Sequence, residues 1–387
     1  MSIANQEMIR DNNRRLVLEY LVNHPPVSRA ELAKQLNLTK ATISNIVQDL
    51  LQQNLVLEIG SAKTAMGRKP ILLEFQKNCG YALAIDVRPN QIITLAANLK
   101  GENCKVQEYA FYQDQELLSL LKEIIAGQIA KYSHTPYGIV GIAVGIYGVV
   151  NNNRILFTPY YPLPQPDLGQ ILEDIFHLPV IVENESNFSV LGESAFHFGY
   201  KNMIHINVHD GIGMGILIGE HLYKGHDGYA GEFGHTILFP DGKPCPCGNC
   251  GCLEQYASEK AILEEYAART GQIQVTMDQF LADYQQKLPA ALEMMDLFVK
   301  YIGINNIINT FNTDLIVINS AFSNYIPDIN SRILEYLSKH QNRDCKIISS
   351  KLQDISGLMG GIRVCVECFL DIQHLQIQTH HKDLEII

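Results

Sequence analysis

The stretch of chain around Cys245–Cys252 constrains the fold more than any other part of the sequence. It reads Gly231-Glu-Phe-Gly-His235 and, ten residues on, Cys245-Pro-Cys-Gly-Asn-Cys-Gly-Cys-Leu-Glu254. Four of the nine cysteines fall within eight residues, among Gly, Pro and Asn residues that favour tight turns. Such a stretch cannot form a packed helix or strand, but thiolates and an imidazole can hold Zn²⁺ in a closed tetrahedral site. We therefore expect a structural zinc that holds Glu232 and its polar neighbours in place.

Composition and the other cysteines favour an ordinary globular protein in a reducing compartment. The 387 residues suffice for two or three domains, and 47% hydrophobic and 18% charged residues are typical of that class. The first residues carry no apolar signal segment, and no run approaches the roughly 20 apolar residues of a membrane span. The remaining cysteines are scattered and the total is odd, which argues against a disulfide framework. We expect a cytoplasmic protein in which Cys365 and Cys368 pack in the core rather than form a redox pair.

Charge is uneven along the chain. Residues 1–77 hold ten Lys and Arg against seven Asp and Glu, whereas residues 78–387 hold 20 against 34. A mildly basic N-terminal module on an acidic body predicts that only the N-terminus meets a polyanion such as DNA.

The N-terminal module has the pattern of a helix-turn-helix. An apolar face predicts a first helix over residues 10–24, ending at Pro25-Pro26. Ser28-Arg-Ala-Glu31 reads as a capping box that starts a second helix, and Thr39 caps a third. The third helix has an apolar stripe on one face and small polar groups with one cation on the other, which predicts entry into the major groove. Its candidate DNA-contacting residues are Thr39, Lys40, Thr42, Ser44, Asn45 and Gln48.

Two strand-like runs, 55–59 and 71–75, flank a loop and predict a β-wing. The loop ends in Gly67-Arg68-Lys69-Pro70, a stiff extended segment with adjacent cations. We expect Arg68 and Lys69 to contact DNA, with Arg68 suited to a narrow minor groove. The alternative is a three-helix packing or dimerisation domain whose polar face is merely solvated. The agreement of caps, apolar stripe, wing and basic tip favours DNA binding.

The remainder of the chain predicts an α/β body large enough for two lobes. Strand-like runs lie at 81–87, 91–99, 105–111, 139–146, 205–208, 215–218 and 315–318, with a helix near 115–131. We expect three domains: a winged helix-turn-helix at 1–77, a first lobe at 78–192, and a second lobe with the zinc loop at 193–387. The C-terminal helix can return to the first lobe.

This body resembles the ROK family of sugar kinases and sugar-responsive repressors, whose motifs occur here in the family's order. The similar segments are Gly141–Val150, Val182–Asn187 with Leu191–Glu193, Gly211–Gly215, and the highly specific signature at Gly231–His235 and Cys245–Glu254. The winged module matches the repressor branch of the family. The resemblance covers nearly the whole chain, and it implies an actin-like, ribonuclease-H-like two-lobed fold with a sugar in the cleft.

Carried over position by position, the resemblance implies a metal site and a sugar site. The zinc ligands would be His235, Cys245, Cys247 and Cys252, with Cys250 at a variable position. The sugar contacts would be Asn184, Glu185, Glu232, His235 and Glu254. Carboxylates accept hydrogen bonds from sugar hydroxyls, and an amide both donates and accepts them. The alternative, that the carboxylates only support the zinc loop, fits less well with their spread over three motifs.

Four departures from the family's kinases argue against phosphoryl transfer, which needs a cradle of amides and small residues and a base. Asp86-Val-Arg-Pro-Asn90 stands where the kinases have Asp-x-Gly-Gly-Thr. Asp210 replaces the usual Thr of the second phosphate loop, and Asn319-Ser320 replaces a Gly-Gly pair. Glu185 replaces the catalytic Asp, and a displacement of about 1 Å can cost on the order of 10²-fold in rate.

These observations predict a transcriptional repressor rather than an enzyme. It would bind a double-stranded operator as a homodimer and be released by a sugar or sugar phosphate. The first alternative is a DNA-tethered sugar kinase with residual ATP-dependent activity. The second is a DNA binder that uses the ROK body only for dimerisation. Turnover with ATP separates the first from a repressor, and stabilisation by a sugar separates the second.

Overall fold

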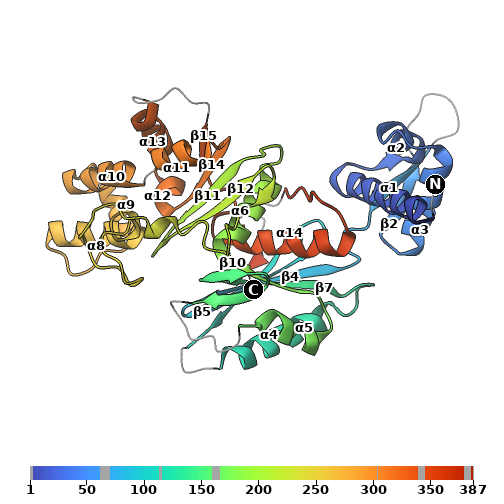
Figure 1. Ribbon diagram of the computed structural model, residues 1–387, viewed down its shortest axis with the longest axis horizontal. Coiled ribbons are helices and arrows are strands. Elements are labelled where there is room, and N and C mark those ends of the chain that lie inside the picture. Colours follow the sequence, from blue (N-terminus) through green and yellow to red (C-terminus); the bar gives the residue numbers. More distant parts are fainter. Residues whose placement is uncertain are drawn as a thin grey trace. The chain divides into compact units, whose positions relative to one another are not determined.

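The computed structural model describes residues 3–61, 70–112, 116–158, 166–302, 304–338, 345–378 and 385–386 (Figure 1). The chain divides into two compact units. Unit 1 comprises Met1–Gly145, Leu163–Val182 and Gly361–Ile387, and unit 2 comprises Ile146–Pro162 and Glu183–Gly360. The predicted domain boundaries at residues 77 and 192 remain predictions. Within the described ranges, no helix is both long enough and apolar enough to cross a membrane.

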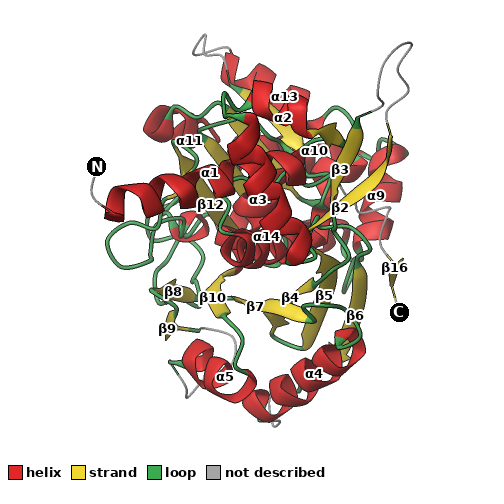
Figure 2. Ribbon diagram, turned by 90° about the vertical axis from the view of Figure 1, so that its right-hand side faces the viewer, coloured by secondary structure: helices red, strands yellow, loops and turns green. Residues whose placement is uncertain are grey.

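The winged module at the start of unit 1 consists of three helices and a small sheet (Figure 2). Its elements are α1 (Ile3–Asn23), β1 (Val27–Ser28), α2 (Arg29–Gln35), α3 (Lys40–Gln52), β2 (Val56–Ser61) and β3 (Ile71–Phe75). The strand order is β1-β3-β2 with both pairs antiparallel. Each helix buries one apolar face, and that of α3 is the predicted stripe of Ile43, Ile46, Val47 and Leu50. The expected winged helix-turn-helix is therefore confirmed.

Side-chain caps start the two helices of the helix-turn-helix. Ser28 Oγ accepts a hydrogen bond from Glu31 N at 3.2 Å, and Thr39 Oγ1 accepts one from Thr42 N at 3.1 Å. The second half of the predicted capping box is wrong. The Glu31 carboxylate accepts instead from Gln35 Nε2 at 2.8 Å, and Ser28 also ends strand β1.

The rest of unit 1 is built on a six-stranded mixed sheet of order β10-β7-β4-β5-β6-β16. Its strands are β4 (Tyr81–Arg88), β5 (Gln91–Asn98), β6 (Lys105–Ala110), β7 (Ile139–Ile146), β10 (Val180–Asn184) and β16 (Glu385–Ile386). Strand β7 is buried at every residue, as its continuous apolar run requires. Helices α4 (Leu117–Tyr132) and α5 (Leu168–Phe176) cover one face, and α14 (Ser356–Leu370) lies on the other (Figures 1 and 2).

Unit 2 is built on a five-stranded sheet of order β13-β12-β11-β14-β15. Its strands are β11 (Met203–Val208), β12 (Ile212–Ile218), β13 (His221–Leu222), β14 (Leu315–Asn319) and β15 (Lys346–Ser349). Strands β11 to β13 form an antiparallel meander, whereas β14 and β15 run parallel to β11. A separate hairpin joins β8 (Val149–Asn151) to β9 (Arg154–Phe157).

Alternate residues of the unit 2 strands serve the two faces of the sheet. Met203 of β11 packs with Val190 of α6 (Glu185–Phe196), whereas Ile204 and Ile206 enter a larger core on the other side. That side carries α7 (Glu254–Ala257), α8 (Glu259–Thr270), α9 (Met277–Gln285), α10 (Pro289–Tyr301), α11 (Ile304–Phe311), α12 (Ala321–Tyr325) and α13 (Ile329–Ser338). Two short 3-10 helices, η1 (Phe233–His235) and η2 (Gln353–Ile355), complete the elements of unit 2.

The structure corrects one sequence expectation about the core. Cys365 is buried in α14 with 2% of its surface exposed, so its predicted core packing is confirmed. Cys368, one turn later, is exposed, so the same prediction for it is wrong.

Candidate functional site

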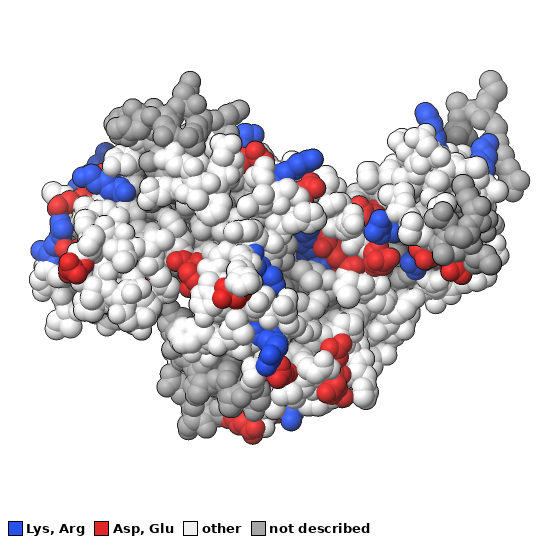
Figure 3. Space-filling model, viewed as in Figure 1, with Lys and Arg blue, Asp and Glu red and all other residues white. Residues whose placement is uncertain are grey.

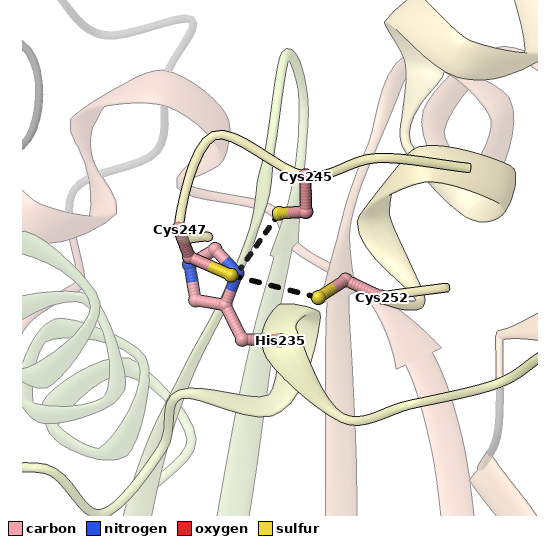
Figure 4. Close-up of side chains that lie close together, drawn as sticks. All are labelled: His235, Cys245, Cys247 and Cys252. Carbon is pink, nitrogen blue, oxygen red and sulfur yellow. Dashed lines mark hydrogen bonds between the residues drawn. The ribbon is translucent and has the colours of Figure 1, made fainter. Parts of the chain in front are cut away.

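Four side chains of the cysteine-rich loop and η1 point at one another (Figure 4). The ligand atoms of His235, Cys245, Cys247 and Cys252 all lie within 4.8 Å of one another. Cys245 Sγ is 3.6 Å from His235 Nδ1, and Cys247 Sγ is 3.6 Å from Cys252 Sγ. A tetrahedral zinc site with Zn–S bonds of about 2.3 Å has ligand-to-ligand edges of about 3.6–3.8 Å. These two separations match the edge of a tetrahedral site, and all four atoms are close enough together for one ion to bind them.

Glycines and backbone hydrogen bonds shape this loop. The N–H of Cys245 donates to Asn249 O at 2.9 Å, and the N–H of Gly248 donates back to Cys245 O at 3.0 Å. Gly251 has a φ of 81°, and a Cβ there would lie 1.6 Å from Phe239 O. Only glycine fits such a position, so the loop is closed tightly enough to aim its thiols at one point.

The thiols of the cluster differ in acidity. Desolvation raises the pKa of Cys245, whose thiol also donates to Glu254 Oε1 at 3.1 Å. Desolvation also opposes ionisation of Cys247, but the Asn249 N–H and the neighbouring thiols outweigh it and lower its pKa. Cys247 is thus the thiol that ionises first, and a bound metal would deprotonate the others.

Each ring nitrogen of His235 has a carboxylate close to it. Glu254 Oε1 lies 3.5 Å from Nδ1, and Glu232 Oε2 lies 3.8 Å from Nε2. Glu254 is nearly buried and accepts a hydrogen bond from Gln255 Nε2 at 3.2 Å. The ring therefore directs Nδ1 at the thiols and leaves Nε2 beside Glu232. The structure brings together three predicted sugar contacts: Glu232, His235 and Glu254.

Asn184 serves as the N-cap of α6. Its Oδ1 accepts hydrogen bonds from Ser186 N at 2.9 Å and Asn187 N at 3.2 Å, and its Nδ2 donates to Gly148 O at 2.7 Å. Both acceptor sites of the amide oxygen are used by the cap, so the side chain can offer a ligand at most one N–H.

The carboxylate of Glu185 is hydrogen-bonded within unit 2. Its Oε2 accepts from Ser186 Oγ at 2.9 Å, and its Oε1 accepts from Ser189 Oγ at 3.3 Å and from Asn207 Nδ2. Asn207 Oδ1 in turn accepts from Asn319 Nδ2 at 2.9 Å. The residue at the family's catalytic position thus belongs to a chain of polar side chains that reaches β14.

That chain continues to the start of α12. Asn319 Nδ2 lies 3.3 Å from His209 Nε2, and His209 Nδ1 lies 3.8 Å from Glu259 Oε2. Glu259 Oε1 accepts from Ala321 N at 2.6 Å and from Ser320 Oγ at 2.9 Å. We define the closed network as Glu185, Asn207, Asn319, His209 and Glu259.

Negative charges near the start of α12 favour the protonated form of His209 in the closed network. Desolvation alone would lower the pKa of His209, but Glu259 and Asp354 raise it above its ordinary value. The amide and hydroxyl donors at a helix start suit an anion. In this chain the anion is the protein's own Glu259 carboxylate.

A second internal ion pair lies at the end of β4 in unit 1. Arg88 Nε donates to Asp86 Oδ2 at 2.7 Å, and Asp86 is 6% exposed. The guanidinium of Arg88 therefore neutralises the carboxylate of Asp86.

The predicted DNA-contacting residues of α3 lie on the side opposite its buried stripe. Lys40, Asn45 and Gln48 are exposed. The hydroxyls of Thr39 and Thr42 bond each other at 2.8 Å as part of the cap. The exposed hydroxyl of Ser44 donates to the backbone of the preceding turn at 2.8 Å.

The basic tip of the wing, Arg68 and Lys69, lies outside the described residues. On the face drawn in Figure 3, acidic and basic residues occur in small mixed groups. Charge on that face therefore does not single out the winged module.

Sequence reasoning missed most of the closed network. The sequence patterns described above do not single out His209, Asn207 or Glu259. One signal was available: Asn207 is a polar residue inside the apolar run of β11. It is 5% exposed, so it needs a buried partner.

Comparison with known sequences places the chain in a family. The sequence model of the ROK family matches residues 82–366, and that of the MarR family matches residues 12–62. The chain belongs to the ROK family. This ROK protein is 32% identical to the xylose repressor of Bacillus spizizenii over an alignment of 383 residues that covers 96% of this chain and 99% of the relative. The resemblance read from the sequence is confirmed.

Solved structures agree on the fold of this ROK protein. A ROK family transcriptional regulator, a homologue of the Escherichia coli MLC protein, has a TM-score of 0.78 at 24% identity, covering 94% of this chain and 96% of that one. A ROK family glucokinase from Streptomyces griseus, in complex with glucose and AMPPNP, has a TM-score of 0.64 at 22% identity. It covers 74% of this chain and 99% of its own. A winged helix-turn-helix followed by a ROK body is thereby confirmed.

Proposed function

We propose that this ROK protein is a sugar-responsive transcriptional repressor that binds a double-stranded operator as a homodimer. The main support for the proposal is that one chain contains both a DNA-binding fold and a cluster of polar side chains in its ROK body. The first is a winged helix-turn-helix with exposed polar groups on α3, and the second consists of Glu232, His235 and Glu254. The xylose repressor relative matches over 99% of its length, so it spans both parts. The protein would act in the cytoplasm, which suits its nine free thiols.

The sugar would be held by Asn184, Glu185, Glu232, His235 and Glu254. Glu232 and the Nε2 of His235 support this assignment because they lie side by side and offer an acceptor and a donor to neighbouring hydroxyls. Asn184 would contribute one amide N–H. Glu185 would contribute by exchanging a hydrogen bond within the closed network for one to the sugar.

The resident ion would be Zn²⁺, bound by His235, Cys245, Cys247 and Cys252. Four protein ligands leave no open position, so the ion would be structural rather than catalytic. By binding Nδ1 of His235 it would fix the ring so that Nε2 faces Glu232. This is how a metal loop can orient a sugar contact without touching the sugar.

DNA would be read by α3 through Lys40, Asn45 and Gln48, with Thr39, Thr42 and Ser44 beside them. An exposed amide such as Asn45 or Gln48 can pair with adenine in the major groove, and Lys40 can bind phosphate or guanine. Arg68 and Lys69 of the wing would contact the adjacent backbone or minor groove. Sugar binding would lower operator affinity, which requires a different sugar affinity in the two states.

We do not propose phosphoryl transfer, because internal contacts occupy the groups it would need. Glu259 takes the donors at the start of α12, and Arg88 pairs with Asp86. The likeness to the glucokinase concerns the fold alone.

The test begins with selection of operator fragments from a random DNA pool by the purified protein. Operator affinity is then measured by fluorescence anisotropy with xylose, glucose, N-acetylglucosamine and their phosphates. One sugar should weaken binding by about 5- to 150-fold, the usual range of allosteric coupling. The proposal fails if no sugar alters operator affinity, or if a coupled ATPase assay shows turnover of about 1 s⁻¹ or more.

A further inference from the structure

Among the described residues, the winged module contacts the rest of unit 1 at several points, and the first of these attachments along the chain is the end of α1. The Asn23 side chain donates through Nδ2 to His374 O at 2.6 Å and accepts through Oδ1 from Gln376 N at 2.9 Å. Glu19 Oε2 accepts from Gln373 N at 2.9 Å. The side-chain amide of Asn23 thus forms hydrogen bonds through both its nitrogen and its oxygen to the backbone of residues 374–376.

Further contacts make this first attachment stiff. Lys100, in the turn after β5, donates through Nζ to Val22 O, and burial lowers its pKa. The linker between β3 and β4 is short, and Leu99 N, next to Lys100, donates to Lys77 O of the linker at 3.0 Å. Lys77 Nζ forms an ion pair at 2.6 Å with Glu102 Oε2, two residues after Lys100 in the same hairpin. The end of α1 is therefore an anchor made of several contacts.

The second attachment is at the end of α3 and includes a hydrogen bond from one hydroxyl. Tyr137 Oη donates to the backbone oxygen of Gln53, the C-cap of α3, at 2.6 Å. Burial raises the pKa of Tyr137, so its hydroxyl stays protonated and able to donate. The Tyr137 ring meets Phe369 edge-on, with centroids 5.0 Å apart and planes at 71°.

Phe369 belongs to α14, a helix shared by both units. Its first turns lie in unit 2 and the remainder, from Gly361, lies in unit 1. Each part contains a glycine at a close approach. A Cβ on Gly360 would lie 1.8 Å from Phe188 O of α6, and one on Gly361 would lie 2.8 Å from Ala143 Cβ of β7. The first turns of α14 are thus in direct contact with α6.

We propose that Phe369 and Tyr137 transmit the position of α14 to the DNA-reading helix α3, which makes Tyr137 a positioning residue for operator binding. The inference rests on the proposed function, because α6 begins at Asn184 and Glu185, two of the sugar contacts proposed above. A carbonyl at a helix end lacks a partner within the helix, so it binds either Tyr137 or water. Such a bond can be exchanged readily, whereas the α1 anchor holds the module in place.

The decisive variant is Tyr137→Phe in the full chain, because it removes the hydroxyl and keeps the ring against Phe369. Operator affinity without sugar, and sugar affinity without DNA, should stay within about twofold of wild type, as for loss of one exposed hydrogen bond. The weakening of operator binding by sugar should fall from about 5- to 150-fold to roughly twofold or less. The probe is whichever of xylose, glucose or N-acetylglucosamine weakens wild-type binding.

A matched control is Tyr109→Phe, which removes a hydroxyl 3.5 Å from Gln107 Oε1 in β6 of the same unit. It should respond to sugar as the wild type does. Phe369→Leu tests the other half of the contact and should also lose the response while it keeps sugar affinity. If Tyr137→Phe abolishes operator binding outright, Phe369→Leu decides alone.

Retention of the full sugar response by both Tyr137→Phe and Phe369→Leu overturns the transmission through Tyr137 but leaves the repressor proposal intact. The transmission is overturned in the same way if Phe369→Leu responds fully where Tyr137→Phe no longer binds operator. A wild-type protein that ignores every sugar overturns the repressor proposal, and the transmission falls with it. The two failures are thus distinguished by the wild type alone.

Discussion

The cysteine-rich loop and the closed network are both polar clusters of unit 2, but they differ in what completes them. In the loop, the ligand atoms of His235 and three cysteines lie within 4.8 Å of one another, and thiols are poor hydrogen-bond partners. In the closed network, donors from the chain itself serve Glu185 and Glu259. The first arrangement calls for an ion from outside, whereas in the second the chain itself supplies partners to both carboxylates and, of the network's buried side-chain atoms that the structure describes, only Asn319 Oδ1 lacks one. Family motifs alone do not show which polar cluster needs an external ion and which has its partners within the chain.

The largest expected effect comes from breaking the loop. Cys247→Ser should lose bound zinc and lower the melting temperature strongly, because structural zinc contributes about 10–16 kcal/mol of binding free energy in small zinc-finger peptides. Zinc content by mass spectrometry and unfolding by calorimetry measure both effects. Cys250→Ser is the matched control, since Cys250 is exposed and lies outside the four-residue cluster. Retention of zinc by Cys247→Ser contradicts the assignment.

A smaller effect is expected beside the closed network, where His205 of β11 is fully buried. Burial lowers its pKa to about 4, against the opposing pull of Glu193, and His209 and His197 lower it further. Since the unfolded state, with a pKa of about 6.5, takes up a proton first, stability is complete above about pH 6.5 and is lost as the pH falls toward 4. The loss at about pH 5 is roughly 2 kcal/mol.

Urea unfolding at several pH values measures this loss. His205→Asn should flatten the dependence between about pH 6.5 and 4, whatever its effect on stability at neutral pH. The control is the exposed His134→Asn, which should leave the slope unchanged. If the unfolding free energy of His205→Asn depends on pH as steeply as that of the wild type, another group takes up the proton.

The smallest effect is expected from Glu259→Gln, which keeps the shape of the side chain but removes its charge. The start of α12 and His209 lose a charged partner, so the protein should be destabilised by about 1–2 kcal/mol. Zinc content should not change, and no ATP-dependent phosphorylation should appear. Gain of such activity would show that the network conceals a working phosphate site, and the contrast with the loop would disappear.

Sequence reasoning succeeded where the determinants are local. The ligands Cys245 to Cys252 lie within eight residues, so their spacing predicts the loop. The apolar runs at 71–75 and 139–146 predict β3 and β7 to the residue. The Thr39 cap likewise depends only on the first turn of its own helix.

Sequence reasoning failed to predict side-chain contacts whose partners come from elements distant in the sequence. The closed network joins α6, β11, α8 and β14, and no local pattern shows that Asn207 meets Glu185. The role of Asn184 as a helix cap competes with its expected role toward a sugar, and a single sequence does not show which role takes the oxygen. The capping box at Ser28 failed for a related reason, since strand pairing with β3 involves the same residue.

The pairing of Asn23 with His374 joins residues 351 positions apart. Contacts between residues so far apart in the sequence form late in folding. During synthesis, the end of α1 leaves the ribosome early, but its partner segment follows only after every residue of unit 2 has been made. An incomplete chain therefore lacks the hydrogen bonds of α1 with residues 373–376. These contacts of the winged module are thus reserved for chains that already carry unit 2.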